Sequence, residues 1–239
     1  MISKEKFQTI ISKYYLSGII ESTVWEIKDN SLTIKFVSPN KDMIGEIKTE
    51  LNIPNNKIGI FDTTKLNKLV SILSNEFALN ISKFKLYLSD SNNYNIEYSL
   101  ADLNIFPKVG EVQVSEFDLT IPLTQENILA IKKASDALQV ETIFIKSYSN
   151  FDNTKFIELM LGDDDSFSDK ISYLIKVPID SPDFNIPFDS SVFKEIISSN
   201  RDCFSGNIQL NLEGLMKLNF VSKNKDIEST YFLVRKESN

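Results

Sequence analysis

One segment of the sequence occurs twice, and this duplication constrains the fold more than any other feature. Residues 57–75 read KIGIFDTTKLNKLVSILSN, and residues 184–200 read FNIPFDSSVFKEIISSN. In both copies an apolar strand pattern ends in Phe-Asp, two hydroxyl residues follow, and an amphipathic helical stripe begins. Phe61 and Asp62 correspond to Phe188 and Asp189, which lie 127 positions further on. Solenoid repeats have periods of roughly 20 to 50 residues, so this longer period indicates a duplicated domain, and the Asp predicts a helix cap.

The length of the chain agrees with a duplication. The 239 residues accommodate two domains of roughly 120 residues, each with its own core. Between the halves, residues 100–117 include Pro107 and Gly110 and show no clear period, which is typical of a connector. We therefore predict an N-terminal domain of residues 1–111 that includes the connector, and a C-terminal domain of residues 112–239.

Each half shows the same order of helix, strands, helix, strands. Apolar spacing of i, i+3, i+4 and i+7 predicts helices over 4–16, over 63–75, from Thr124 to Leu138, and over 189–200. Runs of alternating apolar and polar residues, separated by Asp, Asn and Pro turn signals, predict antiparallel strands between the helices. The predicted fold class is α+β: in each domain two helices cover one face of an antiparallel sheet and leave their outer faces free.

The residue inventory excludes several classes of enzyme. The chain has no His and a single Cys, Cys203, so Ser-His-Asp and Cys-His nucleophile systems, ordinary zinc sites and intrachain disulfides are absent. Neither a GxGxxG nor a GxxxxGK[ST] motif occurs among the 7 Gly residues. We expect a protein that is not an enzyme, with no cofactor and no metal.

The acidic run Asp163, Asp164 and Asp165 leaves one alternative open. Its Gly, Asp and Ser neighbours favour an exposed turn, but three carboxylates could also gather a weakly bound divalent cation. A metal-dependent nuclease that uses these carboxylates is therefore a third possibility.

The charge distribution indicates a basic surface on an acidic protein. The net charge is −7, yet 26 residues are basic and all but two of these are Lys. Several recur on all four predicted helices, away from the apolar stripes, where they could contact a polyanion or simply solubilise the helices. The candidate DNA-binding residues are Lys4, Lys6, Lys13, Lys65, Lys68, Lys132, Lys133, Lys194 and Arg201.

Three stretches resemble a known family. The family is that of the DNA sliding clamps. The second helix of the clamps' first domain is similar to IGIFDTTKLNKLVSIL, and their connector is similar to SLADLNIFPKV. The opening helix and strand of their second domain are similar to LTQENILAIKKASDALQVETIFI. The resemblance is to the polymerase processivity factors of T4-type tailed phages, relatives of the eukaryotic and archaeal clamps. The Asp-rich insertion at 162–169 and the modest basicity of the helices depart from that family.

The resemblance implies a fold and a function. The fold would be two tandem clamp-type domains, and three chains would join head to tail as a homotrimeric ring of six domains. The ring would encircle double-stranded DNA without sequence preference and confer processivity on a replicative DNA polymerase, and a clamp loader would open it. A tail peptide of the polymerase would dock beside the connector. The candidate residues for that groove are Val109, Val112, Val114, Tyr231 and Leu233, all of which could equally be ordinary core or strand residues.

A non-enzymatic viral structural or assembly protein, with a duplicated oligomerisation domain, is the alternative function. No run approaches the roughly 20 apolar residues of a membrane span, and the first residues lack a signal-peptide pattern. We therefore expect a cytoplasmic protein, in the cytoplasm of the host cell if the protein is viral.

Overall fold

The computed structural model describes residues 1–239 apart from 111, 114–115, 163–167 and 238–239. By their internal contacts the residues group into two compact units. One comprises Met1–Glu111 with Asp226–Ser229, and the other comprises Val112–Lys225 with Thr230–Asn239.

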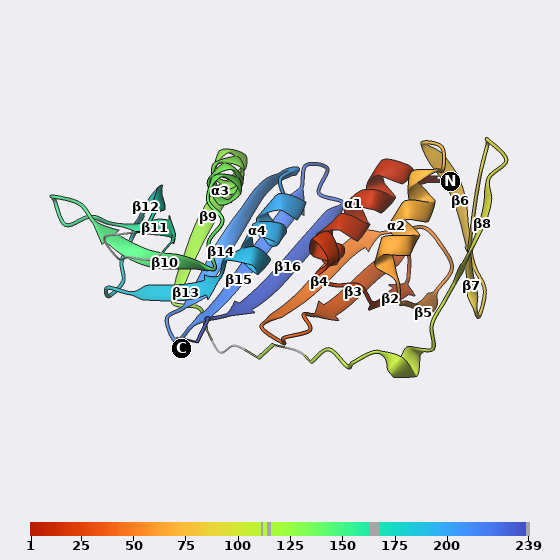
Figure 1. Ribbon diagram of the computed structural model, residues 1–239, viewed down its shortest axis with the longest axis horizontal. Helices are drawn as coiled ribbons and strands as arrows, with labels where there is room; N and C mark the ends of the chain where they lie inside the picture. The colour runs from red at the N-terminus through yellow and green to blue at the C-terminus, as the bar shows by residue number, and fades with distance from the viewer. Residues whose placement is uncertain (111, 114–115, 163–167, 238–239) are drawn as a thin grey trace. The chain divides into compact units, whose positions relative to one another are not determined.

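The described residues of the first unit form two α-helices on antiparallel sheet (Figure 1). Strands β5, β2, β3 and β4 follow one another in one sheet, and β1, β6, β7 and β8 form a second. The elements are β1 (Ile2–Ser3), α1 (Lys4–Tyr15), β2 (Thr23–Lys28), β3 (Ser31–Val37), β4 (Met43–Glu50), β5 (Asn56–Ile60), α2 (Thr63–Ser71), β6 (Glu76–Ile81), β7 (Lys85–Asp90) and β8 (Asn95–Ser99), with short 3-10 helices η1 (Leu16–Gly18) and η2 (Leu103–Ile105).

Helix α1 forms because its apolar side chains share one face, and that face covers the sheet. Phe7, Ile10, Ile11 and Tyr14 are all fully buried. The ring of Trp25 on β2 lies 5.5 Å from that of Phe7 and 6.1 Å from that of Tyr14, both edge to face. Such aromatic pairs add to the stabilisation that burial provides. The helix predicted over 4–16 is confirmed.

The second unit repeats this organisation. Strands β12, β11, β10 and β13 form one antiparallel sheet, and β16, β15, β14 and β9 follow one another in another. The elements are β9 (Leu119–Thr124), α3 (Gln125–Ala137), β10 (Thr142–Ser149), β11 (Lys155–Leu161), β12 (Ile171–Ile179), β13 (Asn185–Asp189), α4 (Ser190–Ser199), β14 (Cys203–Asn211), β15 (Leu215–Ser222) and β16 (Ile227–Val234). The predicted α+β class, with two helices on antiparallel sheet in each half, is confirmed.

The duplicated segment has the same local structure in both units. The Asp62 carboxylate accepts a hydrogen bond from the Lys65 amide at 2.7 Å and caps α2, and Asp189 accepts from the Val192 amide at 2.9 Å and caps α4. The aromatic residues differ, however, because Phe188 is fully buried whereas Phe61 is 60% exposed. The duplication therefore preserves the capped helix but not the burial of its aromatic residue.

Strand β9 is an element that the sequence-based expectation lacked, since no strand was predicted between the connector and the helix beginning at Thr124. Leu119, Ile121 and Leu123 alternate with exposed residues and are buried, so the period of a strand is present. Pro122 obscured it, yet proline is tolerated in a strand that ends a sheet, as β9 does. The predicted capping of α3 by Thr124 is confirmed.

Candidate nucleic-acid and partner-binding surfaces

Four of the candidate cations are exposed and form no ion pair with any described residue. Lys65 and Lys68 lie on α2, Lys133 lies on α3, and Arg201 directly follows α4. The ammonium and guanidinium groups of such residues can contact oxyanions without first breaking an ion pair. These four residues are therefore the best candidates for contacts to a phosphate backbone.

Lys4 and Lys6 on α1 are occupied by interactions within the first unit. The Lys4 ammonium donates to the carbonyl oxygens of Ser71 at 2.6 Å and Leu73 at 2.7 Å, where α2 ends. Carbonyl groups at a helix C-terminus lack helical partners and carry partial negative charge, so they hold a cation well. The Lys6 ammonium lies 3.1 Å from the carboxylate of Asp226. Both lysines are less available to an external anion than Lys65 and Lys68.

Lys13 requires a correction. It is fully buried, so the prediction that it projects from the outer face of α1 is wrong. Helical periodicity placed Lys13 away from the apolar stripe, but the packing covers that flank of the helix as well. The exposed positions of α1 are instead Glu5 and Ser12, which make its outer face neutral to acidic.

Helices α3 and α4 share a charged cluster that the sequence-based prediction did not include. The Asp136 carboxylate accepts a hydrogen bond from Lys132 of the same helix and lies 3.3 Å from the ammonium of Lys194 on α4. Hydrogen bonding by Lys132, with a smaller contribution from Lys194, lowers the pKa of Asp136, so the carboxyl is ionised at neutral pH. The i, i+4 spacing of Lys132 and Asp136 was visible in the sequence, whereas the approach of Lys194 was not.

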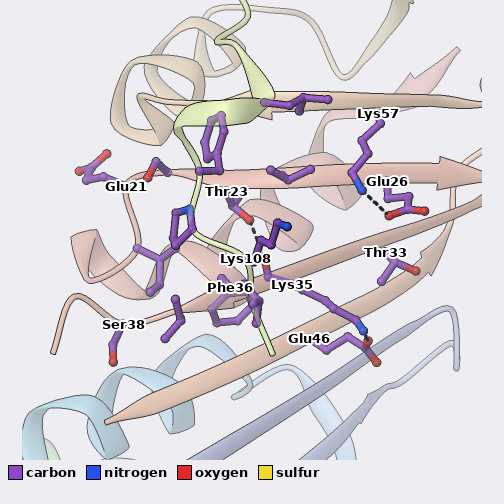
Figure 2. A pocket seen from close by; sticks show the side chains of 18 of the residues that line it. Glu21, Thr23, Glu26, Thr33, Lys35, Phe36, Ser38, Glu46, Lys57 and Lys108 are labelled. Atoms are coloured by element: carbon purple, nitrogen blue, oxygen red, sulfur yellow. Dashed lines mark hydrogen bonds and ion pairs between the residues drawn. The ribbon is translucent and has the colours of Figure 1, made fainter. Parts of the chain in front are cut away.

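A groove of about 1490 Å³ lies over the outer face of strands β2 to β4 in the first unit (Figure 2). The connector crosses these strands, and Leu103, Phe106, Pro107, Lys108 and Val109 line one side of the groove. Further apolar lining residues are Ile19, Ile20, Val24, Val37 and Pro39. Charged and hydroxyl side chains, among them Glu21, Lys28 and Lys41, line the groove together with the apolar ones.

Ion pairs cover the remaining floor of this groove. Lys57 lies 3.1 Å from Glu26, and Lys35 lies 3.6 Å from Glu46 (Figure 2). Glu46 also lies 2.6 Å from Lys48. Each of these pairs is solvent-exposed in part, so the pairs contribute little to stability. They give the groove charges of both signs in addition to its apolar lining residues.

The connector is anchored at Gly59 on β5. A β-carbon at this position would lie 2.4 Å from Cε2 of Phe106 and 2.9 Å from the carbonyl oxygen of Ala101. The Ala101 amide also donates to the Gly59 carbonyl at 3.0 Å. The ring of Phe106 therefore rests on backbone that only glycine leaves uncovered. No pattern in the sequence marked Gly59, because its role depends on a residue 47 positions away.

The five candidate groove residues have four different outcomes. Val109 lines the groove, and Val112 is partly exposed beyond it. Val114 lies outside the described residues. Tyr231 is fully buried and Leu233 is 2% exposed, and Tyr231 packs against Phe220 with ring centroids 6.2 Å apart. A residue that receives a partner must be accessible, so the prediction is wrong for Tyr231 and Leu233, which are core residues.

Two further expectations concern metals and membranes. Asp163, Asp164 and Asp165 lie outside the described residues. Within the described ranges, no group of three or more His, Cys, Asp or Glu side chains is placed to hold a metal ion. None of the helices in those ranges is long and apolar enough to cross a membrane.

Comparison with solved structures defines the fold as that of the PCNA-type sliding clamps. The chain superposes on the A. fulgidus PCNA, from a structure with the C-terminal region of FEN-1 bound, with a TM-score of 0.80 and 14% identity over 100% of this chain and 98% of that chain. The Proliferating Cellular Nuclear Antigen from Entamoeba histolytica gives a TM-score of 0.77 and 15% identity over 98% of this chain and 96% of that chain.

The PCNA from Thermococcus kodakaraensis gives a TM-score of 0.74 and 13% identity over 99% of this chain and 98% of that chain. No family model matches the sequence, and no curated protein matches it significantly. Likeness at this level of identity establishes the clamp fold over the whole chain, which agrees with the resemblance found in the sequence.

Proposed function

We propose that the protein is a DNA sliding clamp, a ring that encircles duplex DNA and tethers a replicative polymerase without catalysing a reaction itself. The observation that carries this proposal is the match of the entire two-unit chain to PCNA-type clamps. The narrower relationship to clamps of T4-type tailed phages, with a place in the host cytoplasm, rests on the sequence resemblance.

The sheet topology supports a ring of three chains. Strand β8 ends one sheet of the first unit and β12 ends one sheet of the second, each paired on one side only among the described strands. Such edges accept a further strand through their free backbone groups. Pairing β8 of one chain with β12 of the next would be heterologous, and a heterologous contact can close a ring. Three chains would supply six units.

The helices provide a chemically suitable surface for DNA. Lys65, Lys68, Lys133 and Arg201 would contact phosphates electrostatically, which holds a ring on any sequence and lets it slide. The acidic remainder of a chain with net charge −7 would keep DNA away from other surfaces.

The groove beside the connector would receive a short peptide of a partner, the polymerase foremost, and a clamp loader would use the same or an adjoining surface. The structure of A. fulgidus PCNA with the C-terminal region of FEN-1 supports this kind of partner. An extended peptide with an apolar anchor and charged neighbours would match the apolar lining residues and the ion pairs of the groove.

A test of topological retention needs neither loader nor polymerase. A linear duplex fixed to a bead by one end is incubated with the protein, and its free end is then blocked with a bulky cap or left open. A clamp remains after a high-salt wash only on capped DNA, and light scattering gives three times the chain mass of 27.3 kDa. Equal loss from capped and open DNA, or a monomer in solution, would overturn the proposal and favour a structural or assembly role.

A further inference from the structure

We propose that the seam between α3 and α4 is a site for a phosphate of the duplex backbone, and that Asp136 occupies this site in the free protein. The proposal rests on the function proposed above, because it assigns one contact within the DNA-facing surface. Asp136 would compete with the phosphate for Lys132 and Lys194 and so weaken the binding of the clamp to DNA.

The geometry of the cluster is that of a built anion site. Lys132 reaches the Asp136 carboxylate from α3, and Lys194 reaches it from α4 with a separation of 3.3 Å. The side chains of Lys132, Lys194 and Asp136 are 25%, 28% and 44% exposed, so an anion from solvent has access to all three. Two cations held by different helices thus converge on one oxyanion, as they would on a phosphate.

The position of Asp136 does not suit helix α3 itself. It is the penultimate residue of α3, whose last turn contains no basic residue. A carboxylate there faces the negative end of the helix dipole, and Asp is a poor helix former. The residue is therefore stabilised by the two ammonium groups and not by the helix. The lowered pKa of its carboxyl agrees with a strongly positive local potential.

The charges of the cluster explain how phosphate and carboxylate would compete. Two ammonium groups and one carboxylate leave an excess of one positive charge, and the chain neighbours Lys133 and Glu195 add one charge of each sign. The cluster therefore attracts a polyanion even while Asp136 is in place. When a phosphate enters, Asp136 must lose its ion pairs with the two lysines. The phosphate therefore gains less binding free energy than it would from two unpaired lysines. A weak contact of this kind favours sliding.

The test compares Asp136→Asn with Asp183→Asn in the full-length trimer. Asp183 also pairs with a lysine, Lys155, at 2.9 Å, and that lysine lowers the pKa of its carboxyl. Asp183 lies in the loop after β12 and on neither helix. Both substitutions change the charge by the same amount, so a general electrostatic effect would appear in both. The probe is a short fluorescent linear duplex titrated at several KCl concentrations.

We expect Asp136→Asn to bind the duplex roughly tenfold more tightly at low salt, with a slope of log affinity against log salt steeper by about one or more. Asp183→Asn should match the wild type, and adding Lys132→Gln and Lys194→Gln to Asp136→Asn should remove the gain. Unchanged salt slope in Asp136→Asn, or an equal rise in both variants, would overturn the proposal.

Two controls keep the outcome interpretable. Asp136→Ala provides a second variant with a better helix former at the same position, and thermal melting checks that both variants fold. A merely structural ion pair would alter the melting temperature and leave the salt slope unchanged. If the wild type is lost equally from capped and open DNA, the proposed clamp function fails; if it is retained but the variants show no steeper slope, this inference alone fails.

Discussion

Replacement of Gly59 by Ala tests how the connector is held. The added β-carbon would lie 2.4 Å from Cε2 and 2.8 Å from Cζ of Phe106. An ordinary carbon–carbon contact is about 3.5 Å or longer, so the ring must retreat by at least about 1 Å. The Ala101 carbonyl oxygen, at 2.9 Å from the new atom, leaves the strand little room to shift instead. The expected response is displacement of Phe106 and of the connector segment around it.

The magnitude follows from the cost of overpacking. Inserting a methyl group into a filled site costs about 1–3 kcal/mol, and Gly59 is buried in strand β5 with backbone on one side. Gly110 in the same connector is a matched control, because a β-carbon there meets nothing within 4 Å. Gly110→Ala should be neutral or stabilising by about 0.4–1 kcal/mol, since it restricts the unfolded chain.

Two assays measure the effect. Urea unfolding followed by the fluorescence of Trp25, the single Trp and a buried residue of the same unit, gives the free energy of unfolding. Trypsin under native conditions measures exposure of the connector at Lys108, whose cleavage should accelerate in Gly59→Ala. In a double-mutant cycle, Phe106→Ala should reduce the cost of Gly59→Ala by about 1 kcal/mol. Two results would refute the anchoring of the connector by Phe106. One is that the losses of unfolding free energy from Gly59→Ala and Phe106→Ala are additive, and the other is that Gly59→Ala has the stability and the rate of proteolysis of the wild type.

Three further predictions concern charge, acid stability and the core. Lys65→Gln combined with Lys68→Gln should weaken duplex binding and reduce its salt slope, measured by fluorescence anisotropy, whereas Lys57→Gln, whose ammonium is paired on the outer sheet face, should not. Hydrogen bonds from Ser74 lower the pKa of Asp90 below its ordinary value of 3.8. The ionised carboxyl therefore stabilises the fold above pH 3.8, and this contribution is lost as the pH falls through the lower pKa of the folded protein. Asp90→Asn should make the melting temperature less dependent on pH in that acid range. Tyr231→Phe should lower the free energy of unfolding in urea by about 1 kcal/mol, because the Tyr231 hydroxyl accepts a hydrogen bond from the buried Asn200 amide at 3.0 Å. The same substitution should leave partner binding unchanged.

Local features of the fold were predictable because they depend on residues close in the sequence. Helix α1 follows from the spacing of Phe7, Ile11 and Tyr14, and the caps of α2 and α4 follow from Asp62 and Asp189. These patterns report periodicity and hydrogen bonds that span no more than a helical turn or two. Strand β9 was missed only because a proline interrupts an otherwise regular alternation.

The clamp fold was predictable from the family resemblance. Composition excluded whole classes of catalytic chemistry, and the duplicated segment with the connector pointed to a clamp, whose fold the whole-chain match then established. The recurrence of lysine on four helices was also visible. Which of those lysines are exposed and unpaired was not, because the sequence does not show which ammonium groups have partners.

Only the tertiary structure decided whether individual candidate residues are buried, paired or exposed. Lys13 became a buried residue, Lys194 met Asp136 across two helices, and Phe106 came to rest on Gly59. The partners of Lys194 and Gly59 lie far away in the chain, and burial and ion pairing of this kind arise only when such segments pack. The sequence by itself thus determined a duplicated, helix-capped α+β chain with lysine-bearing helices, and the packing of distant segments determined which of its charges remain free to act.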